Sequence, residues 1–403
     1  MEQDAVIVGG GLTGPLAALA LAQAGLRSTV LDAAPRPARG PFDGRSYALA
    51  LASVRMLQAL GLWDAVEAPQ PITGIRASDG RPGEGASPLS LRFEASMIGA
   101  PFMGQMVEDR HLRAALLAAC DRDDRIALRF DARVAAQDTD GPRAAATLED
   151  GGRVEGALIV GADGRTGKVA ERAGLRRVVK DYRQSALTCA VAHDRPHGGV
   201  AHQVFLPAGP LAILPLTEDR SAVVWTEDAE TAAALMDADE DAWMDALRPR
   251  FGSFLGGIRL AGARGSYPLT LSLSPDMVAP RVALAGDAAH GIHPIAGQGL
   301  NLGFKDVAAL AEVLRDARRR GEDSGSPDVL QRYARWRRWD ATQMGLATDA
   351  VNRLFSNDDP LLRAARRLGM GAVDRLGGLK RRFVQEAAGL TGDLPVLMRG
   401  QAL

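Results

Sequence analysis

The stretch "DAVIVGGGLTGPLAALALAQAGLRSTVLDA", residues 4–33, decides the fold of this 403-residue chain. It opens with a short run of apolar, β-branched residues, continues through a glycine-rich turn, and closes with a second apolar run after Gly25. Between the two runs, apolar residues recur at helical spacing. The pattern predicts a strand, a tight turn, a helix and a second strand parallel to the first, the unit that binds dinucleotides.

The turn places three glycines at the positions of a G-x-G-x-x-G pattern. Gly9 lets the chain turn sharply, Gly11 leaves room for a pyrophosphate to approach the backbone, and Gly14 lets the helix pack closely on the strand. A bound phosphate would meet the unpaired N–H groups and the positive end of the helix dipole. The predicted cofactor contacts of this turn are Gly9, Gly11, Leu12, Thr13 and Gly14.

An acidic residue, Asp32, closes the second strand about 20 residues after the glycines, where a carboxylate hydrogen-bonds a ribose hydroxyl. An acid at this position favours a nucleotide with a free 2′-hydroxyl, such as FAD or NAD, over one that carries a 2′-phosphate. The alternative is a glycine-rich turn that binds nothing. The strand, helix and acid in register favour the dinucleotide interpretation.

The rest of the chain does not continue as a series of βαβ units. Residues 42–66 predict a loop that runs into a helix, and residues 178–275 are strand-like with turn residues between the strands. The "GADG" after the apolar run at 157–160 predicts a helix that opens at Asp163 and Gly164. Residues 282–306 return to a strand, a loop and a helix that begins near Leu300. The prediction is an α/β fold into which a mostly antiparallel sheet is inserted.

Composition limits the classes of function. A chain of 403 residues exceeds the roughly 250–300 residues at which single cores stop growing, so two lobes around one site are expected. The net charge of −1 gives no sign of a nucleic-acid partner.

Cys120 and Cys189 lack the spacing of a disulfide framework or a zinc site. Without a leader or a spanning segment in the sequence, we expect a cytoplasmic protein.

Three separated motifs carry a resemblance to a known family: "GGGLTG", "GADGRTG" and "GDAAHGIHPIAGQGLN". Their order and spacing resemble the FAD-dependent aromatic hydroxylases of the p-hydroxybenzoate hydroxylase type. Further segments, including "GPLAILPL" and the closing "GDLPVLMRG", look like the ubiquinone-biosynthesis branch of that family. The resemblance covers nearly the whole chain. It implies a Rossmann-like FAD-binding domain, an inserted antiparallel substrate domain and a C-terminal helical segment.

The resemblance also implies site residues. Asp287 corresponds to the acid at the flavin ribityl chain, Arg45 and Gln105 to contacts of the FAD pyrophosphate and neighbouring groups, and Asp163 to a contact of both FAD and the nicotinamide nucleotide. Each has a simpler interpretation, such as a surface salt bridge for Arg45 or a helix-entry residue for Gln105. The 286–301 loop, whose backbone must approach a flat ring, adds Gly286, Asp287, Pro294, Gly297, Gln298, Gly299, Leu300 and Asn301.

Two features of these motifs qualify the resemblance. Where relatives commonly have Ser and a Val-Arg pair, this chain has Gly167 and Val169-Ala170, and the missing arginine bears on nicotinamide contacts. His290 and His293 could ligate a metal, but a third ligand at suitable spacing is missing. We predict hydrogen bonds within the loop for them and no metal site, and we assign no catalytic side chain.

The family activity implies FAD as cofactor, NAD(P)H as electron donor, and a prenylated phenol and O₂ as substrates. The alternatives are the same chemistry on another aromatic compound, or a non-catalytic flavin-binding scaffold of a ubiquinone-synthesis complex. The family domain pattern assigns 1–75, 105–177 and 276–345 to the FAD-binding domain, 76–104 and 178–275 to the substrate domain, and 346–403 to a C-terminal helical region.

Apolar residues of the C-terminal region recur at intervals of three and four, from Leu361 through Leu368, Leu376 and Leu379 to Phe383, among arginines. A basic amphipathic stretch of this kind can lie on an anionic membrane surface or contact other ubiquinone-biosynthesis proteins. It can equally pack on its own domain, and its glycines weaken a continuous helix. We therefore expect a cytoplasmic protein with possible peripheral contact to the inner face of the membrane.

Overall fold

The computed structural model describes residues 3–84, 90–292, 297–355, 369, 371 and 373–403. The amino-terminal unit has the predicted order of β1 (Ala5–Val8), α1 (Thr13–Gln23) and β2 (Ser28–Leu31), and β1 pairs in parallel with β2. Both strands are buried along their whole length. Their short apolar sequences fit a parallel strand that is covered on both faces.

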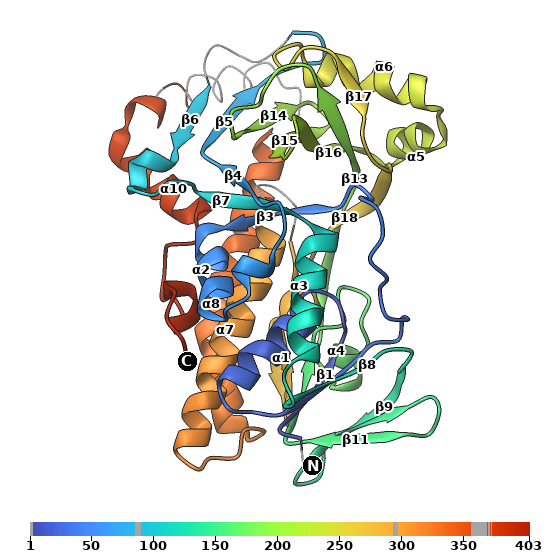
Figure 1. The fold of residues 1–403 in the computed structure, drawn as a ribbon, viewed down its shortest axis with the longest axis vertical. Coiled ribbons are helices and arrows are strands. Elements are labelled where there is room, and N and C mark those ends of the chain that lie inside the picture. Colours follow the sequence, from blue (N-terminus) through green and yellow to red (C-terminus); the bar gives the residue numbers. More distant parts are fainter. Residues whose placement is uncertain (1–2, 85–89, 293–296, 356–368, 370, 372) are drawn as a thin grey trace.

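A mostly parallel sheet surrounds this unit in the order β19, β20, β12, β1, β2, β8. Helix α1 packs against α3 and α7, and Figure 1 shows these helices and α8 filling the lower lobe. The elements of this lobe that have not yet been given are β8 (Ile126–Arg129), β12 (Leu158–Gly161), β19 (Val278–Ala279), β20 (Val282–Leu284), α3 (Asp109–Asp121), α4 (Val169–Arg172), α7 (Gln298–Arg319) and α8 (Pro327–Phe355).

A larger and mostly antiparallel sheet forms the upper lobe in the order β21, β18, β13, β16, β15, β14, β5, β6, with β17 beside β13. Strands β14 and β5 pair in parallel, which joins residues before 80 to the sheet. The strands are β5 (Gly74–Asp79), β6 (Leu91–Glu94), β13 (Val178–His193), β14 (Val200–Leu206), β15 (Gly209–Leu216), β16 (Arg220–Asp228), β17 (Ile258–Leu260), β18 (Gly265–Leu273) and β21 (His290–Gly291). The inserted antiparallel sheet is confirmed, whereas the predicted domain boundaries stay a prediction.

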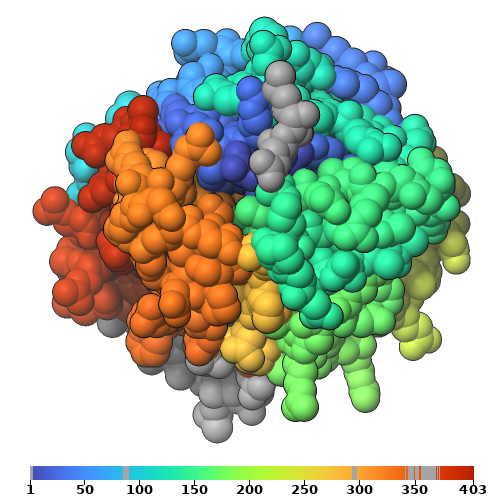
Figure 2. Space-filling view, turned by 90° about the horizontal axis from the view of Figure 1, so that it is seen from below, coloured from blue at the N-terminus to red at the C-terminus, as the bar shows by residue number. Residues whose placement is uncertain are grey.

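Helices α5 (Ala229–Asp237) and α6 (Glu240–Phe251) accompany the upper sheet at one side of Figure 1, and α10 (Gly377–Ala387) lies on the opposite side. Each lobe has its own core. One buried cluster joins β1, α1, α2 (Leu51–Ala59) and α7, and another lies between the upper sheet and α6. Figure 2, seen from the lower end, shows α7 and α8 in orange beside the blue amino-terminal segments.

Two small sheets complete the fold, in the orders β3, β7, β4 and β11, β10, β9. Their strands are β3 (Ser46–Ala50), β4 (Gln70–Ile72), β7 (Gly104–Glu108), β9 (Val134–Asp138), β10 (Ala144–Leu148) and β11 (Arg153–Gly156). Short 3-10 helices cover Trp63–Ala65, Ala95–Ile98, Gly286–Ala288 and Val396–Arg399.

Local boundaries differ from the sequence prediction at three places. Residues 46–50 form strand β3, and the helix predicted there starts only at α2 (Leu51–Ala59). The alternating small apolar residues fit either period, and pairing with β7 decides the outcome. Helix α7 begins at Gln298 instead of near Leu300, and α4 begins at Val169 instead of directly at Asp163. Among the described residues, no helix is long and apolar enough to cross a membrane.

Candidate active site

A cavity of about 1280 Å³ is lined by residues of both lobes. On one side lie the turn after β1, strand β3 and the first turn of α7. On the other side lie strands of the larger sheet, including β14, β15, β16 and β18. The lining is mostly apolar, so the cavity combines a glycine-rich turn with a wall suited to a hydrophobic molecule.

The glycine-rich turn shows why each glycine is needed. A Cβ added at Gly14 would lie 1.8 Å from the Gly9 carbonyl oxygen, and one at Gly9 would lie 2.2 Å from the Ala162 carbonyl oxygen. Gly9 also has a φ of +115°, which side chains rarely adopt. At Gly11, by contrast, an added Cβ meets no atom within 4 Å, and Gly11 lines the cavity. The turn therefore has two glycines that the fold requires and one that leaves space open toward the cavity.

The 286–301 segment forms a second part of the same wall. Gly286, Asp287, Gly297, Gln298 and Gly299 all line the cavity, as do Leu300 and Asn301. Gly297 caps α7 with a φ of 63°, so the first N–H groups of a long helix lie at the cavity wall. This end of the helix favours negative charge. The predicted contact Pro294 lies outside the described residues.

The hydrogen-bonding groups of the Asn301 side chain are all satisfied by the protein itself. Its Nδ2 donates to the carbonyl oxygens of Ala48, at 2.8 Å, and Gly297, at 3.0 Å. Its Oδ1 accepts from the Ala50 amide at 2.8 Å and from the Ser53 hydroxyl at 2.7 Å. Asn301 thus ties the start of α7 to β3 and α2, and only its backbone is left to meet a cofactor.

Asp163, which was predicted as a cofactor contact, turns back onto its own loop. Its Oδ2 accepts from the Val169 amide at 3.0 Å, at the start of α4, and its Oδ1 is buried without a partner in the described part of the chain. Burial raises the pKa of this carboxyl above its ordinary value. A Cβ at Gly167 would lie 2.1 Å from Asp163 Cγ. The glycine that departs from the family pattern therefore makes room for this carboxylate.

The other predicted residues are more dispersed. Asp32 accepts from the backbone amides of Gly10 and Ala34, so its carboxylate stands beside the glycine turn, although it does not line the cavity. Gln105 is buried in β7, and its Oε1 has no partner among the described residues. Arg45 lines the cavity with a 60% exposed side chain that donates to Asp43 at 2.8 Å.

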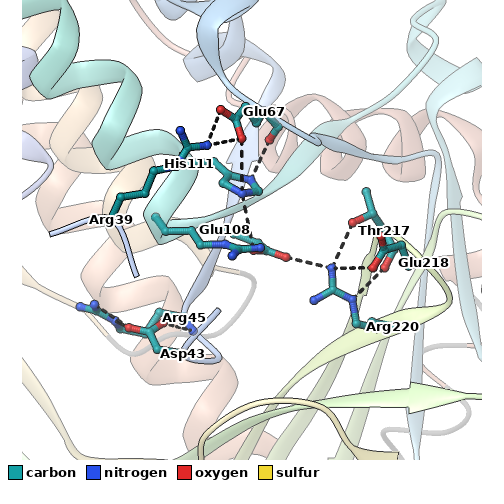
Figure 3. Close-up of polar contacts among 10 residues, drawn as sticks. Arg39, Asp43, Arg45, Glu67, Glu108, His111, Thr217, Glu218 and Arg220 are labelled. Carbon is teal, nitrogen blue, oxygen red and sulfur yellow. Dashed lines mark hydrogen bonds and ion pairs between the residues drawn. The ribbon is translucent and has the colours of Figure 1, made fainter. Parts of the chain in front are cut away.

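A polar network extends from the part of the cavity wall at Asp43 and Arg45 and joins β7 to the upper sheet (Figure 3). Glu108, at the end of β7, is buried and accepts from Arg110 at 2.7 Å and from Arg220 of the upper sheet at 3.0 Å. His111 lies against the Glu67 carbonyl oxygen at 3.0 Å. The guanidinium groups of Arg110 and Arg220 also lie within 6 Å of the Phe42 ring. These contacts fix the segment that leads into Asp43 and Arg45.

A buried charge cluster supports the 286–291 segment from behind. Asp306 of α7 is completely buried and accepts from the Gly286 amide at 2.9 Å, from His290 Nε2 at 2.5 Å and from Arg337 Nε at 2.8 Å. Arg337 of α8 is also fully buried and donates to Asp340 at 2.6 Å. His290 forms a hydrogen bond, as predicted, but its partner Asp306 lies on α7 and not within the loop, and His293 lies outside the described residues. The described residues contain no cluster of three or more metal-ligating side chains.

Comparison with known proteins identifies the family. The model of the FAD binding domain family matches residues 2–346. The chain belongs to this family. The flavoprotein is 45% identical to "Ubiquinone hydroxylase UbiL" of Rhodospirillum rubrum over 99% of its own length and 93% of the relative's. It is 36% identical to the 3-demethoxyubiquinol 3-hydroxylase of Escherichia coli, over 96% of this chain and 98% of the relative.

Solved structures agree on the fold of the flavoprotein. The p-nitrophenol 4-monooxygenase of Pseudomonas putida superposes with a TM-score of 0.81, at 22% identity, over 97% of this chain and 99% of that one. HpxO of Klebsiella pneumoniae, solved with FAD and uric acid, gives 0.75 at 19% identity over 95% and 96% of the two chains. The flavoprotein therefore has the fold of the flavin monooxygenases, and it is an FAD-dependent hydroxylase.

The site fits FAD on three observations. The position that lacks a side chain at Gly11 faces open space, the amino end of α7 lies at the cavity wall, and Asp287 presents a 39% exposed carboxylate to the cavity. Each suits one part of the cofactor: the pyrophosphate, the electron-rich side of the ring and the ribityl hydroxyls.

The structure also places residues at the cavity that the sequence analysis does not name. Arg165 donates to Asp287 at 2.8 Å and to the Ile292 carbonyl oxygen at 3.2 Å, which joins two predicted motifs. Arg113 and Tyr267 also line the cavity. Arg165 follows Asp163 in "GADGRTG", so its motif was visible, but nothing in the sequence indicated its partner. The other two carry no local pattern and become neighbours only through the fold.

Proposed function

We propose that this flavoprotein hydroxylates the aromatic ring of a polyprenylated phenol in ubiquinone biosynthesis, with NAD(P)H and O₂ as co-substrates. The observation that carries the proposal is the cavity, which is large, mostly apolar and lined in part by the glycine turn. Two relatives of this chain are named as hydroxylases of ubiquinone or demethoxyubiquinol. The cavity volume of about 1280 Å³ exceeds the roughly 300–1,000 Å³ of ordinary small-molecule sites. There is room for a flavin ring and an apolar substrate together.

In this proposal the cavity wall, together with Asp32 beside the glycine turn, holds the successive parts of FAD. The turn after β1 and Arg45 hold the pyrophosphate, Asp32 the ribose and Asp287 the ribityl chain, while the backbone of 297–300 meets the ring. When bound, FAD would accept hydride from the nicotinamide and, once reduced, activate dioxygen. Asp163 and Gln105, each with a buried oxygen that has no partner among the described residues, remain proposed cofactor contacts.

The protein's own residues exclude water and orient the ring. Apolar side chains of the upper sheet, such as Ile75, Phe205 and Leu214, line the cavity opposite the glycine turn. An apolar wall keeps water away from the reacting atoms and accepts a hydrophobic ring. The N–H groups at the start of α7 favour the negative charge that develops on a reduced flavin.

The test uses the full chain reconstituted with FAD under nitrogen. NADPH or NADH is added with and without a short-chain prenylphenol, and loss of the flavin absorption is followed in time. Air is then admitted, and the product mass is measured. We expect the phenol to accelerate flavin reduction and to gain one oxygen atom. Absence of both effects with either nicotinamide would refute the proposed activity.

We also propose that the inner membrane surface is where the substrate is collected. Leu376, directly before α10, is 55% exposed, and Leu379 and Phe383 on α10 are 39% and 48% exposed; Phe383 also lines the cavity. Arg381 and Arg382 lie exposed on the same helix. The apolar patch is therefore continuous with the cavity and flanked by cations, as expected of a surface that meets anionic lipids.

Co-sedimentation with vesicles tests this surface. We expect binding to vesicles that contain anionic lipid, weakened by Arg381→Glu with Arg382→Glu. The matched control is Arg248→Glu with Arg259→Glu, one exposed arginine on α6 and one on β17, elements that lie across the upper lobe from α10. Equal binding by both double variants would argue against α10 as the contact.

A further inference from the structure

One wall of the cavity carries an isolated amide. Along β14, Val204 and Leu206 belong to the core between the sheet and α6, while Ala201 belongs to the cluster on the other face. Successive residues of a strand point to opposite faces, so Gln203 shares its face with Ala201 and Phe205. All three line the cavity. The Gln203 side chain therefore points toward the cavity.

Within its row of the sheet, this amide has short apolar side chains on both sides, and its diagonal polar neighbour is the buried Asp79 of β5, which stands opposite Phe205. Gln203 stands directly opposite Ala77 on β5 and Ala212 on β15, and Ala212 stands opposite Val224 on β16. Directly opposite residues have Cβ atoms about 4.5–5.5 Å apart, so the long amide side chain rises above its neighbours. The next polar side chain in the row is Thr188, which pairs with Val224 three strands away from Gln203. At about 4.8 Å per strand, that is roughly 14 Å.

The amide has no partner within the described part of the chain: no hydrogen bond of the Gln203 side chain is found there. In an open cavity water satisfies such a group. When an apolar molecule displaces that water, an amide left without a partner costs free energy, whereas an amide that meets an oxygen on the ligand does not. Its two N–H donors and one carbonyl acceptor can pair with a hydroxyl or an ether oxygen.

We propose that Gln203 is a specificity-determining residue that hydrogen-bonds an oxygen substituent on the substrate ring. The inference rests on the proposed function, because it takes the ring of a phenol as the occupant of this wall. An oxygen held at Gln203 places the ring over the alanine floor formed by Ala77 and Ala212. Molecules of the same shape that lack the oxygen bind poorly, because they leave the amide unpaired.

The test compares Gln203→Leu, which keeps the approximate volume and removes the hydrogen bond, with Gln58→Leu, the same change at an exposed position on α2. Both holoenzymes are titrated with a short-chain prenylphenol and with the corresponding prenylbenzene, which lacks the oxygen. We expect Gln203→Leu to raise the KM for the phenol about tenfold and to reduce the preference for phenol over prenylbenzene by a similar factor. Gln58→Leu should match wild type.

Other measurements separate the failures. Thermal unfolding and FAD affinity should match wild type in Gln203→Leu, because the residue bonds no described part of the protein and lies on the substrate wall. If wild type responds to the phenol and Gln203→Leu has the same KM and the same preference, the role of Gln203 is refuted and the proposed function stands. If wild type itself fails to respond to the phenol, the proposed function falls and this inference falls with it.

Discussion

The glycine turn offers the sharpest prediction, because the same small substitution should have opposite effects at two neighbouring positions. A methyl group at Gly14 would lie 1.8 Å from the Gly9 carbonyl oxygen, well inside contact distance. Helix α1 and β1 would have to separate, at a cost of about 1–3 kcal/mol or more for overpacking. At Gly11 the methyl group meets no atom within 4 Å. Gly11→Ala should therefore change stability by less than about 0.5 kcal/mol.

FAD binding should be affected in the opposite way: Gly11→Ala, which leaves stability almost unchanged, should weaken it directly. The methyl group of Gly11→Ala would occupy the space through which a pyrophosphate reaches the backbone, so we expect FAD affinity to fall at least tenfold, about 1.4 kcal/mol. The assays are urea unfolding of the FAD-free protein and a fluorescence titration of the same sample with FAD. Normal FAD affinity in a folded Gly11→Ala protein, or an unchanged free energy of unfolding in urea for Gly14→Ala, would refute this account of the turn.

Further predictions concern buried groups. Arg337→Met removes one partner of the fully buried Asp306 and should cost about 3–5 kcal/mol of unfolding free energy, measured by urea titration; a loss under 1 kcal/mol would contradict a tight pair. Burial alone would raise the pKa of Asp306, but His290 and Arg337 lower it below the ordinary 3.8. The ionised Asp306 therefore stabilises the fold above pH 3.8, and this contribution is lost as the pH falls further. The difference in unfolding free energy between wild type and Asp306→Asn should narrow only in that acid range. Burial raises the pKa of the Cys120 and Cys189 thiols to about 12, so neither should be alkylated at pH 8 before unfolding, as intact mass will report.

The sequence was most informative where local chemistry dictates the backbone. The β1–α1–β2 unit could be predicted because continuous apolar runs and fixed glycine spacing have few other solutions. Strand β3 could not, because "SYALALAS" fits both helical and extended periods and only its pairing with β7 decides between them. The late start of α4 has a similar cause. The carboxylate of Asp163 accepts from the Val169 amide and occupies the preceding turn.

The candidate site shows the same division. Gly11 and Gln298 were named from contiguous glycine-rich motifs and Asp287 from the family resemblance, and the fold places all three at the cavity. Their contacts with FAD stay predictions. Asn301 also lines the cavity, but only the fold shows that its side chain is fully hydrogen-bonded to the protein. Gln203 stands in an ordinary strand. The small side chains beside it, Ala77 and Ala212, lie 126 and 9 positions away in the sequence and become its neighbours only through sheet pairing. No single-sequence pattern reports such a neighbourhood.

The two walls of the cavity therefore place different demands on the chain. On the proposed cofactor side, backbone groups would carry much of the binding beside a few side chains such as Asp287. That wall therefore requires missing side chains and helix ends, and Asp306 holds the Gly286 amide in place from within the core. On the substrate side, the backbone is used up in sheet pairing, so recognition falls to the few side chains that rise above a small-residue surface. Substitutions on the first wall should change FAD affinity or stability, and substitutions on the second should change which ring is accepted. Gln203→Leu and Gly11→Ala, measured on the same two assays, should separate along this line.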